Sequence, residues 1–151
     1  MKEDSFTLSE IQISYIPKIP TLNKAKITCS EDAYKQFLLL LDHNQFHIRE
    51  EAAVLFLNRA NRVIGGYKLS VGGITGTVMD IRIILGIALK SLSCGIIIAH
   101  THPSGELKPS KGDIDLTKKL KEAARFMEIE ILDHLIITSD AYISMAEEGI
   151  L

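Results

Sequence analysis

The first third of the chain contains one strand-like and one helical pattern of apolar positions. Residues 10–16 alternate between apolar and polar side chains, which predicts an edge strand that Pro17 ends, because proline cannot donate to a ladder. Ser30, followed by two acidic residues, predicts a serine-capped helix that continues to about Asp42. Apolar side chains recur at helical spacing at Tyr34, Phe37, Leu38 and Leu41.

The middle of the chain changes to the short apolar runs that are typical of strands. Residues 52–57 form such a run, 58–61 are polar turn material, and 62–70 resume a strand-like pattern. Together they predict a β-hairpin whose first strand is buried on both faces. The glycine-rich stretch 72–77 predicts a flexible loop after the hairpin.

Helices and strands alternate through the second half. Asp80 is expected to cap a helix that continues through Leu92. A buried strand is predicted at 95–100 and a helix from Ser110 to Met127. Closing strands are expected at 128–138 and 142–145. Because strands and helices alternate without internal repeats, the sequence predicts one three-layer α/β domain.

Composition narrows the class of protein. The 151 residues are 46% hydrophobic and 24% charged, which excludes wholesale disorder. The net charge of −2 is atypical of a protein that binds nucleic acid through many phosphate contacts. Cys29 and Cys94 fit reduced thiols rather than a disulfide scaffold. With no signal-peptide pattern and no apolar run of membrane-spanning length, we expect a cytoplasmic protein without a membrane partner.

The residues at the end of the predicted strand 95–100 carry the candidate chemistry. His100 and His102 are separated by one residue, so both side chains are expected on the same face of the strand. The loop that follows delivers Asp113 on the first turn of the next helix. Two imidazoles and one carboxylate are a ligand set of catalytic zinc sites, in which solvent takes the fourth position.

A purely structural interpretation covers part of this pattern. Ser110 and Asp113 fit a capping box, with the serine as cap and the aspartate three residues later, near the positive end of the helix. That interpretation explains both residues without a metal. It does not explain why His100 and His102 are directed to the same place immediately upstream.

The spacing resembles a known motif. The string His100-Thr101-His102, seven residues, Ser110, two residues, Asp113 resembles the metalloprotease motif of the JAB/MPN (JAMM) superfamily. The resemblance implies that His100, His102 and Asp113 are ligands of Zn²⁺. It also implies that Ser110 hydrogen-bonds the tetrahedral intermediate, as an oxyanion donor does.

The flanking sequence is similar to the RadC family in particular. The similarity includes residues 57–61 and 132–135 and extends over 30–151, which leaves 1–29 as an N-terminal extension. It implies a JAB/MPN-like (cytidine-deaminase-like) fold, with a mixed central sheet flanked by helices.

The family motif also requires an upstream glutamate that moves protons as a general base. Glu50 and Glu51 are the candidates, and the family register favours Glu50. This chain has Ala52-Ala53 where RadC relatives commonly have a bulky residue. A slip of one residue would turn the carboxylate to the opposite face of the strand, so both candidates stay open.

Asp133 and His134 interrupt the apolar pattern of a predicted strand and have two interpretations. The family resemblance implies a pair at the rim of the site, or behind it, that orients a ligand. The alternative is a histidine that is hydrogen-bonded within the core.

The leading hypothesis is a zinc-dependent hydrolase that cleaves a peptide or isopeptide bond in a peptide or protein substrate. One alternative is a non-catalytic scaffold of the same fold that acts through a partner surface. Another is a DNA-repair-associated binding protein, which the historical name of the RadC family suggests and the net charge disfavours.

Overall fold

The centre of the structure is a five-stranded sheet with the strand order β2-β1-β3-β4-β5. The computed structural model describes residue 9 and residues 16–151, so the predicted edge strand at 10–16 lies, apart from Ile16, outside the described residues. The strands are β1 (Glu51–Leu57), β2 (Val63–Val71), β3 (Gly95–Thr101), β4 (Glu130–Ile137) and β5 (Tyr142–Ser144). β3 and β4 are parallel and the other neighbours are antiparallel, so the sheet is mixed, as expected.

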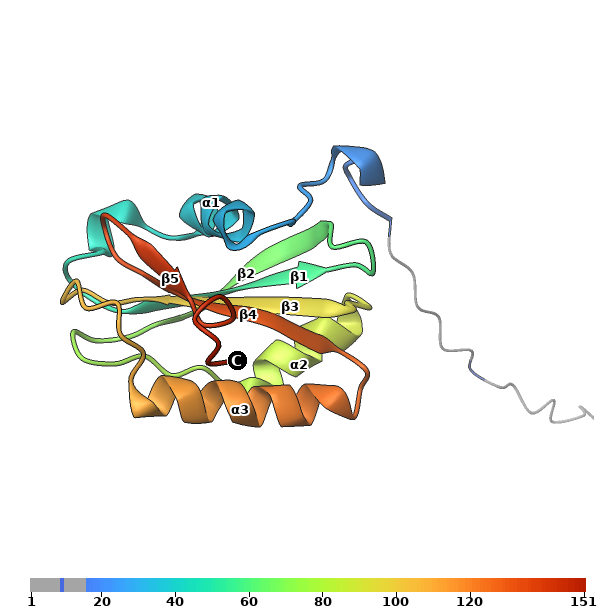
Figure 1. Ribbon diagram of the computed structural model, residues 1–151. Helices are drawn as coiled ribbons and strands as arrows, with labels where there is room; N and C mark the ends of the chain where they lie inside the picture. The colour runs from blue at the N-terminus through green and yellow to red at the C-terminus, as the bar shows by residue number, and fades with distance from the viewer. Residues whose placement is uncertain (1–8, 10–15) are drawn as a thin grey trace, which may run out of the picture.

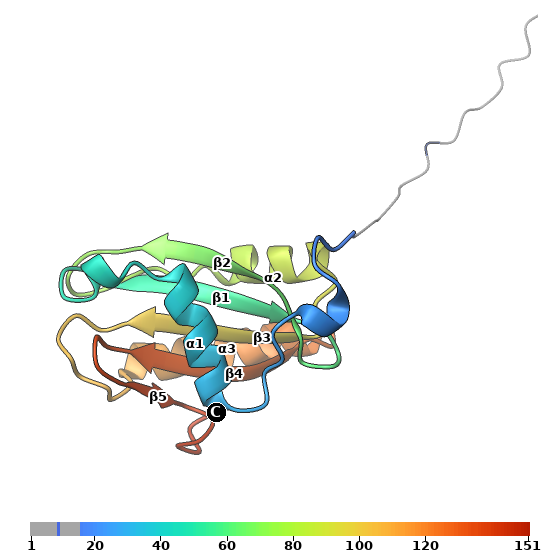
Figure 2. The same cartoon turned by 90° about the horizontal axis from the view of Figure 1, so that it is seen from above.

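Within residues 16–151, three α-helices cover the two faces of this sheet. They are α1 (Ser30–Leu40), α2 (Ile81–Lys90) and α3 (Lys111–Arg125). α1 lies across one face, and α2 and α3 lie against the other, as the two perpendicular views show (Figures 1 and 2). The predicted three-layer α/β domain is therefore confirmed, and the arrangement is consistent with a JAB/MPN-like fold.

Strand alternation divides the core into two clusters. Every residue of β1 and β3 is buried, as predicted for a first hairpin strand with apolar residues on both faces. Leu55 and Ile97 pack in the cluster under α1, whereas Phe56 and Ile98 pack in the cluster under α2 and α3. Odd-numbered and even-numbered residues of β1 and β3 thus face opposite layers, which decides where the candidate site residues point.

The start of α1 differs from the prediction. Cys29 occupies the N-cap position, and Ser30 is already the first helical residue, so the predicted serine cap is wrong. The Asp32 carboxylate instead accepts from the backbone N–H of Thr28 at 2.9 Å and from its hydroxyl at 2.6 Å. The helix ends at Leu40, because Leu41 is already extended.

The other predicted elements are confirmed to within a few residues. Asp80 caps α2 by accepting from the backbone N–H of Arg82 at 2.9 Å. α2 ends two residues before the predicted Leu92, which has a positive φ of 55° and cannot continue the helix. Residues 72–77 contain no helix or strand, as expected of a loop. Within the described part of the chain, none of the helices has the length and apolar character needed to cross a bilayer.

Candidate metal centre

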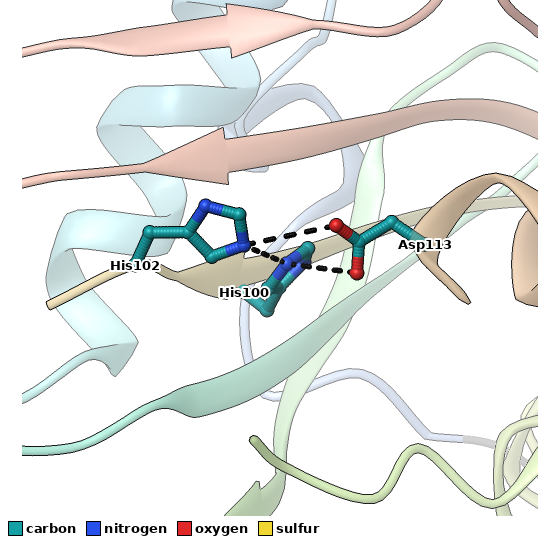
Figure 3. A group of neighbouring side chains, drawn as sticks. All are labelled: His100, His102 and Asp113. Carbon is teal, nitrogen blue, oxygen red and sulfur yellow. Dashed lines mark hydrogen bonds and ion pairs between the residues drawn. The ribbon is translucent and has the colours of Figure 1, made fainter. Parts of the chain in front are cut away.

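Three side chains converge where β3 ends and α3 begins (Figure 3). His100 Nε2 lies 2.8 Å from His102 Nε2 and 3.2 Å from Asp113 Oδ1. His102 Nε2 lies 3.7 Å from Asp113 Oδ2. Ligand atoms arranged tetrahedrally around zinc are about 3.3 Å apart, since each lies about 2.0–2.1 Å from the ion. The structure therefore brings together the three predicted ligands at spacings that fit a single small cation.

The proton of His102 is placed by a backbone carbonyl. His102 Nδ1 lies 2.7 Å from the carbonyl oxygen of Glu106, in the loop between β3 and α3. A carbonyl oxygen only accepts, so Nδ1 of His102 carries the hydrogen. In the neutral ring, the opposite nitrogen, Nε2, therefore carries the lone pair, and it is directed at Asp113 and His100.

The proton of His100 is placed by a longer chain of hydrogen bonds. The Thr117 hydroxyl donates to the backbone carbonyl of Asp113 at 2.6 Å, which uses its single hydrogen. His134 Nδ1, 2.6 Å from Thr117 Oγ1, must then donate to that oxygen. His134 Nε2 consequently accepts from His100 Nδ1, 2.8 Å away. In the neutral ring of His100, Nε2 then keeps its lone pair, like Nε2 in the neutral ring of His102.

Electrostatics keep these groups in the required ionisation states. Burial lowers the pKa of His134 to about 3, so its ring is neutral near neutral pH. Burial alone would raise the pKa of Asp113, but the interactions of its carboxylate with the neighbouring His100 ring and with Ser110 outweigh it. The pKa of Asp113 is accordingly well below its usual range. Two imidazole rings and an ionised carboxylate thus face one another, an arrangement that a cation between them stabilises.

Ser110 has the capping role that the sequence allowed. Its Oγ accepts from the backbone N–H of Asp113 at 3.1 Å, and Asp113 Oδ2 accepts from the backbone N–H of Ser110 at 2.7 Å. The predicted capping box is therefore confirmed. Because Asp113 Oδ1 is directed at His100 while Oδ2 serves the cap, capping and metal binding are compatible at this residue. Ser110 is exposed and lines the cleft described below.

The structure separates the two glutamates before β1. Ala52 pairs with His100, and continuing that register places Glu50 opposite His102 on the same face. Glu51 is only 2% exposed and, like the other odd-numbered residues of β1, faces the cluster under α1. Its carboxylate accepts from the backbone N–H of Asp42 at 3.0 Å and from Lys68 Nζ at 3.4 Å. Glu50 therefore faces the three candidate ligands, and Glu51 faces the layer of α1.

The neighbours Asp133 and His134 also point to opposite faces. His134 contacts His100, as described above. The Asp133 carboxylate instead accepts from the backbone N–H of Ala146 at 3.0 Å and from the Ser144 hydroxyl at 2.5 Å. Asp133 thereby connects β4 to the end of β5 and the turn that follows. Thr117 was missed by the sequence reasoning, although its position one helical turn after Asp113 was a signal that could have identified it.

An open cleft of about 770 Å³ lies in front of the three ligands. Glu50, Ser110 and Lys108 line it, together with residues 74–79 of the loop after β2. Within that loop, Ile74 and Val78 are highly exposed apolar side chains. The candidate centre thus lies at the wall of a cleft that opens to the surface.

Comparisons with known proteins agree with the geometry. The family model described as the RadC-like JAB domain matches residues 27–150. Over 132 residues the chain is 44% identical to a UPF0758 protein of Flavobacterium johnsoniae, covering 85% of this chain and 55% of the relative. UPF0758 proteins of Staphylococcus carnosus and Porphyromonas gingivalis are 43% and 41% identical over 138 residues each. Those alignments cover 89% and 90% of this chain, and 58% and 59% of the relatives. The chain thus spans somewhat more than half the length of these relatives.

Proposed function

The chain belongs to the family of RadC-like JAB domains, and from this membership and the geometry of the centre we propose that it is a zinc-dependent hydrolase of peptide or isopeptide bonds. The observation that carries the proposal is the convergence of three potential ligand atoms, from His100, His102 and Asp113, at the wall of an open cleft. Neutral imidazoles and a carboxylate suit Zn²⁺, and three protein ligands leave a position open for solvent or substrate.

Zn²⁺ held by these residues would supply Lewis acidity, which lowers the pKa of a coordinated water and polarises a substrate carbonyl. The chain itself supplies the proton transfers. Glu50 lines the cleft beside the ligands, and its backbone N–H and carbonyl are held by Gly73 and Gly72 at 2.9 and 2.8 Å. A carboxylate on a backbone held in this way can take a proton from water and deliver it to the leaving amine.

Ser110 supports the developing negative charge. Its oxygen accepts within the capping box, a bond that does not use the hydroxyl hydrogen, so that hydrogen can turn toward an oxyanion in the cleft. A hydroxyl that the cap already orients is a preorganised donor for an oxyanion, the type of interaction that contributes most when charge develops. Capping and catalysis therefore use the same orientation of one side chain.

The substrate we propose is a peptide or protein. The cleft is open, which suits an extended chain, and the apolar side chains of Ile74 and Val78 on its wall can pack against substrate side chains. Both cysteines are free, which supports a cytoplasmic setting where thiols stay reduced.

The test combines metal analysis with a substrate screen. Purified protein is loaded with Zn²⁺, dialysed, and assayed on fluorogenic peptides and on lysine-linked isopeptides. We expect about one zinc per chain, hydrolysis in at least one substrate class, and loss of both zinc and hydrolysis in His100→Ala. Stoichiometric zinc with no hydrolysis of either class would favour the scaffold alternative, and no zinc binding would overturn the proposal.

A further inference from the structure

We propose that Thr117 and His134 are positioning residues that fix which nitrogen of His100 carries the proton, and so keep its Nε2 available to a metal ion. The inference deepens the proposed function and rests on it only for the identity of the metal. It concerns two residues that lie behind the centre, away from the cleft, and that do not bind the ion themselves.

The evidence is a continuous series of hydrogen bonds that connects two of the proposed ligands, His100 and Asp113. It runs from the His100 ring through His134 and Thr117 to the backbone carbonyl of Asp113, over 2.8, 2.6 and 2.6 Å. The path crosses three elements, because His100 is on β3, His134 on β4 and Thr117 on α3. All three side chains are buried, so solvent does not compete for these bonds.

The direction of donation along this path is set by its last acceptor, the backbone carbonyl of Asp113. The carbonyl of Asp113 cannot donate, so Thr117 donates to it and must accept from His134. The opposite direction would require Thr117 to turn its hydrogen toward His134. His134 would then donate to His100, and the proton of His100 would move to Nε2, where it would occupy the ligand position.

His102 provides an internal comparison. Its Nδ1 donates to the backbone carbonyl of Glu106, so its tautomer is fixed by the course of the loop and not by His134 or Thr117. A change at Thr117 is therefore expected to alter the tautomer of His100 and leave that of His102 unchanged. This difference separates a directed proton path from general damage to the site.

The matched variants are Thr117→Val and Thr117→Ser. Valine keeps the volume and β-branching but has no hydroxyl, so His134 Nδ1 loses its acceptor; serine keeps the hydroxyl. Long-range ¹H–¹⁵N NMR of the metal-free proteins reports the tautomer of each histidine, and competition with a chelator reports zinc affinity. We expect wild type and Thr117→Ser to hold His100 with its proton on Nδ1. Thr117→Val should shift that proton toward Nε2 and weaken zinc binding by about 10–100-fold.

The outcomes distinguish this inference from the proposed function. If Thr117→Val keeps the wild-type tautomer of His100 and binds zinc as wild type does, the inference fails while the function stands. If wild type binds no zinc, the function fails, yet the NMR of the metal-free protein still decides the proton path. If the valine variant does not fold, the NMR spectrum of the wild-type protein alone still tests the inference. A scalar coupling between His100 Nδ1 and His134 Nε2, with the proton on His100, supports the path, and a proton on His100 Nε2 overturns it.

Discussion

Glu50 and Glu51 are adjacent in the sequence, but their carboxylates lie on opposite faces of the sheet. Glu50 lines the cleft with the candidate ligands, whereas Glu51 is buried and connects Asp42 to Lys68. The difference follows from the two-residue period of an extended chain. The sequence alone left open whether Glu50 or Glu51 is the general base. Because the two side chains face different layers, substituting each of them is expected to give opposite results.

Glu50→Gln is expected to keep the fold and the zinc content and to lose hydrolysis, because an amide cannot take the proton from water. Glu51→Gln should keep hydrolysis and lower the free energy of unfolding by about 1 kcal/mol, since the ion pair with Lys68 is lost. Zinc content, thermal unfolding and turnover of the two variants are compared side by side. Full activity in Glu50→Gln would mean that a residue other than Glu50 is the general base.

His102→Ala is expected to lower zinc from about one ion per chain to a substoichiometric level, because two remaining ligands hold the metal weakly. His47→Ala is the matched control: His47 is also a histidine, but it is exposed and is not one of the grouped ligands. Elemental analysis after dialysis gives the comparison. Equal zinc loss in both variants would show that the ion binds surface histidines rather than the proposed centre.

Much of this arrangement could be predicted because it depends on local periodicity. The buried strand before His100, the turn at 58–61 and the capping box at Ser110 follow from short-range patterns, and the structure confirms each of them. The spacing of His100, His102 and Asp113 likewise required only a strand, a loop and the first turn of a helix.

The remainder depends on register and on contacts between distant elements. The cap of α1 was assigned to Ser30, but the N-cap residue is Cys29, and the Asp32 carboxylate accepts hydrogen bonds from the backbone N–H and the hydroxyl of Thr28. Local propensity does not distinguish this arrangement from a serine cap. Asp133 and His134 were treated as one pair, although a strand directs them to opposite faces. The path from His134 to Thr117 joins β4 to α3, and no sequence spacing encodes that distance.

The metal-free protein is expected to lose stability as the pH falls below about 6.5, the value of an unperturbed histidine. Burial lowers the pKa of His134 to about 3, so between these values the unfolded chain takes up a proton at this residue and the folded protein does not. The free energy of unfolding therefore falls, by up to about 1.4 kcal/mol per pH unit from this group.

The measurement is denaturant unfolding of metal-free wild type and His134→Gln between pH 7 and pH 4. Glutamine does not titrate, so the free energy of unfolding of the variant should depend less steeply on pH, by an amount that corresponds to about one proton, whatever its absolute stability. Identical slopes in the two proteins would mean that His134 takes up its proton in the folded state at an ordinary pH, contrary to its burial.

Ser110 is expected to contribute separately to stability and to catalysis, and two substitutions separate these contributions. Ser110→Ala removes both the cap acceptor and the oxyanion donor, and it should cost about 1 kcal/mol of stability and about 10²–10³-fold in kcat. Ser110→Asp restores an acceptor for the backbone N–H of Asp113 but has no hydroxyl, so stability should recover while kcat stays low. Thermal unfolding and steady-state kinetics on the same preparations give both quantities. Recovery of kcat together with stability in Ser110→Asp would mean that Ser110 acts only as a cap, and the oxyanion donor would then have to be sought elsewhere along the cleft.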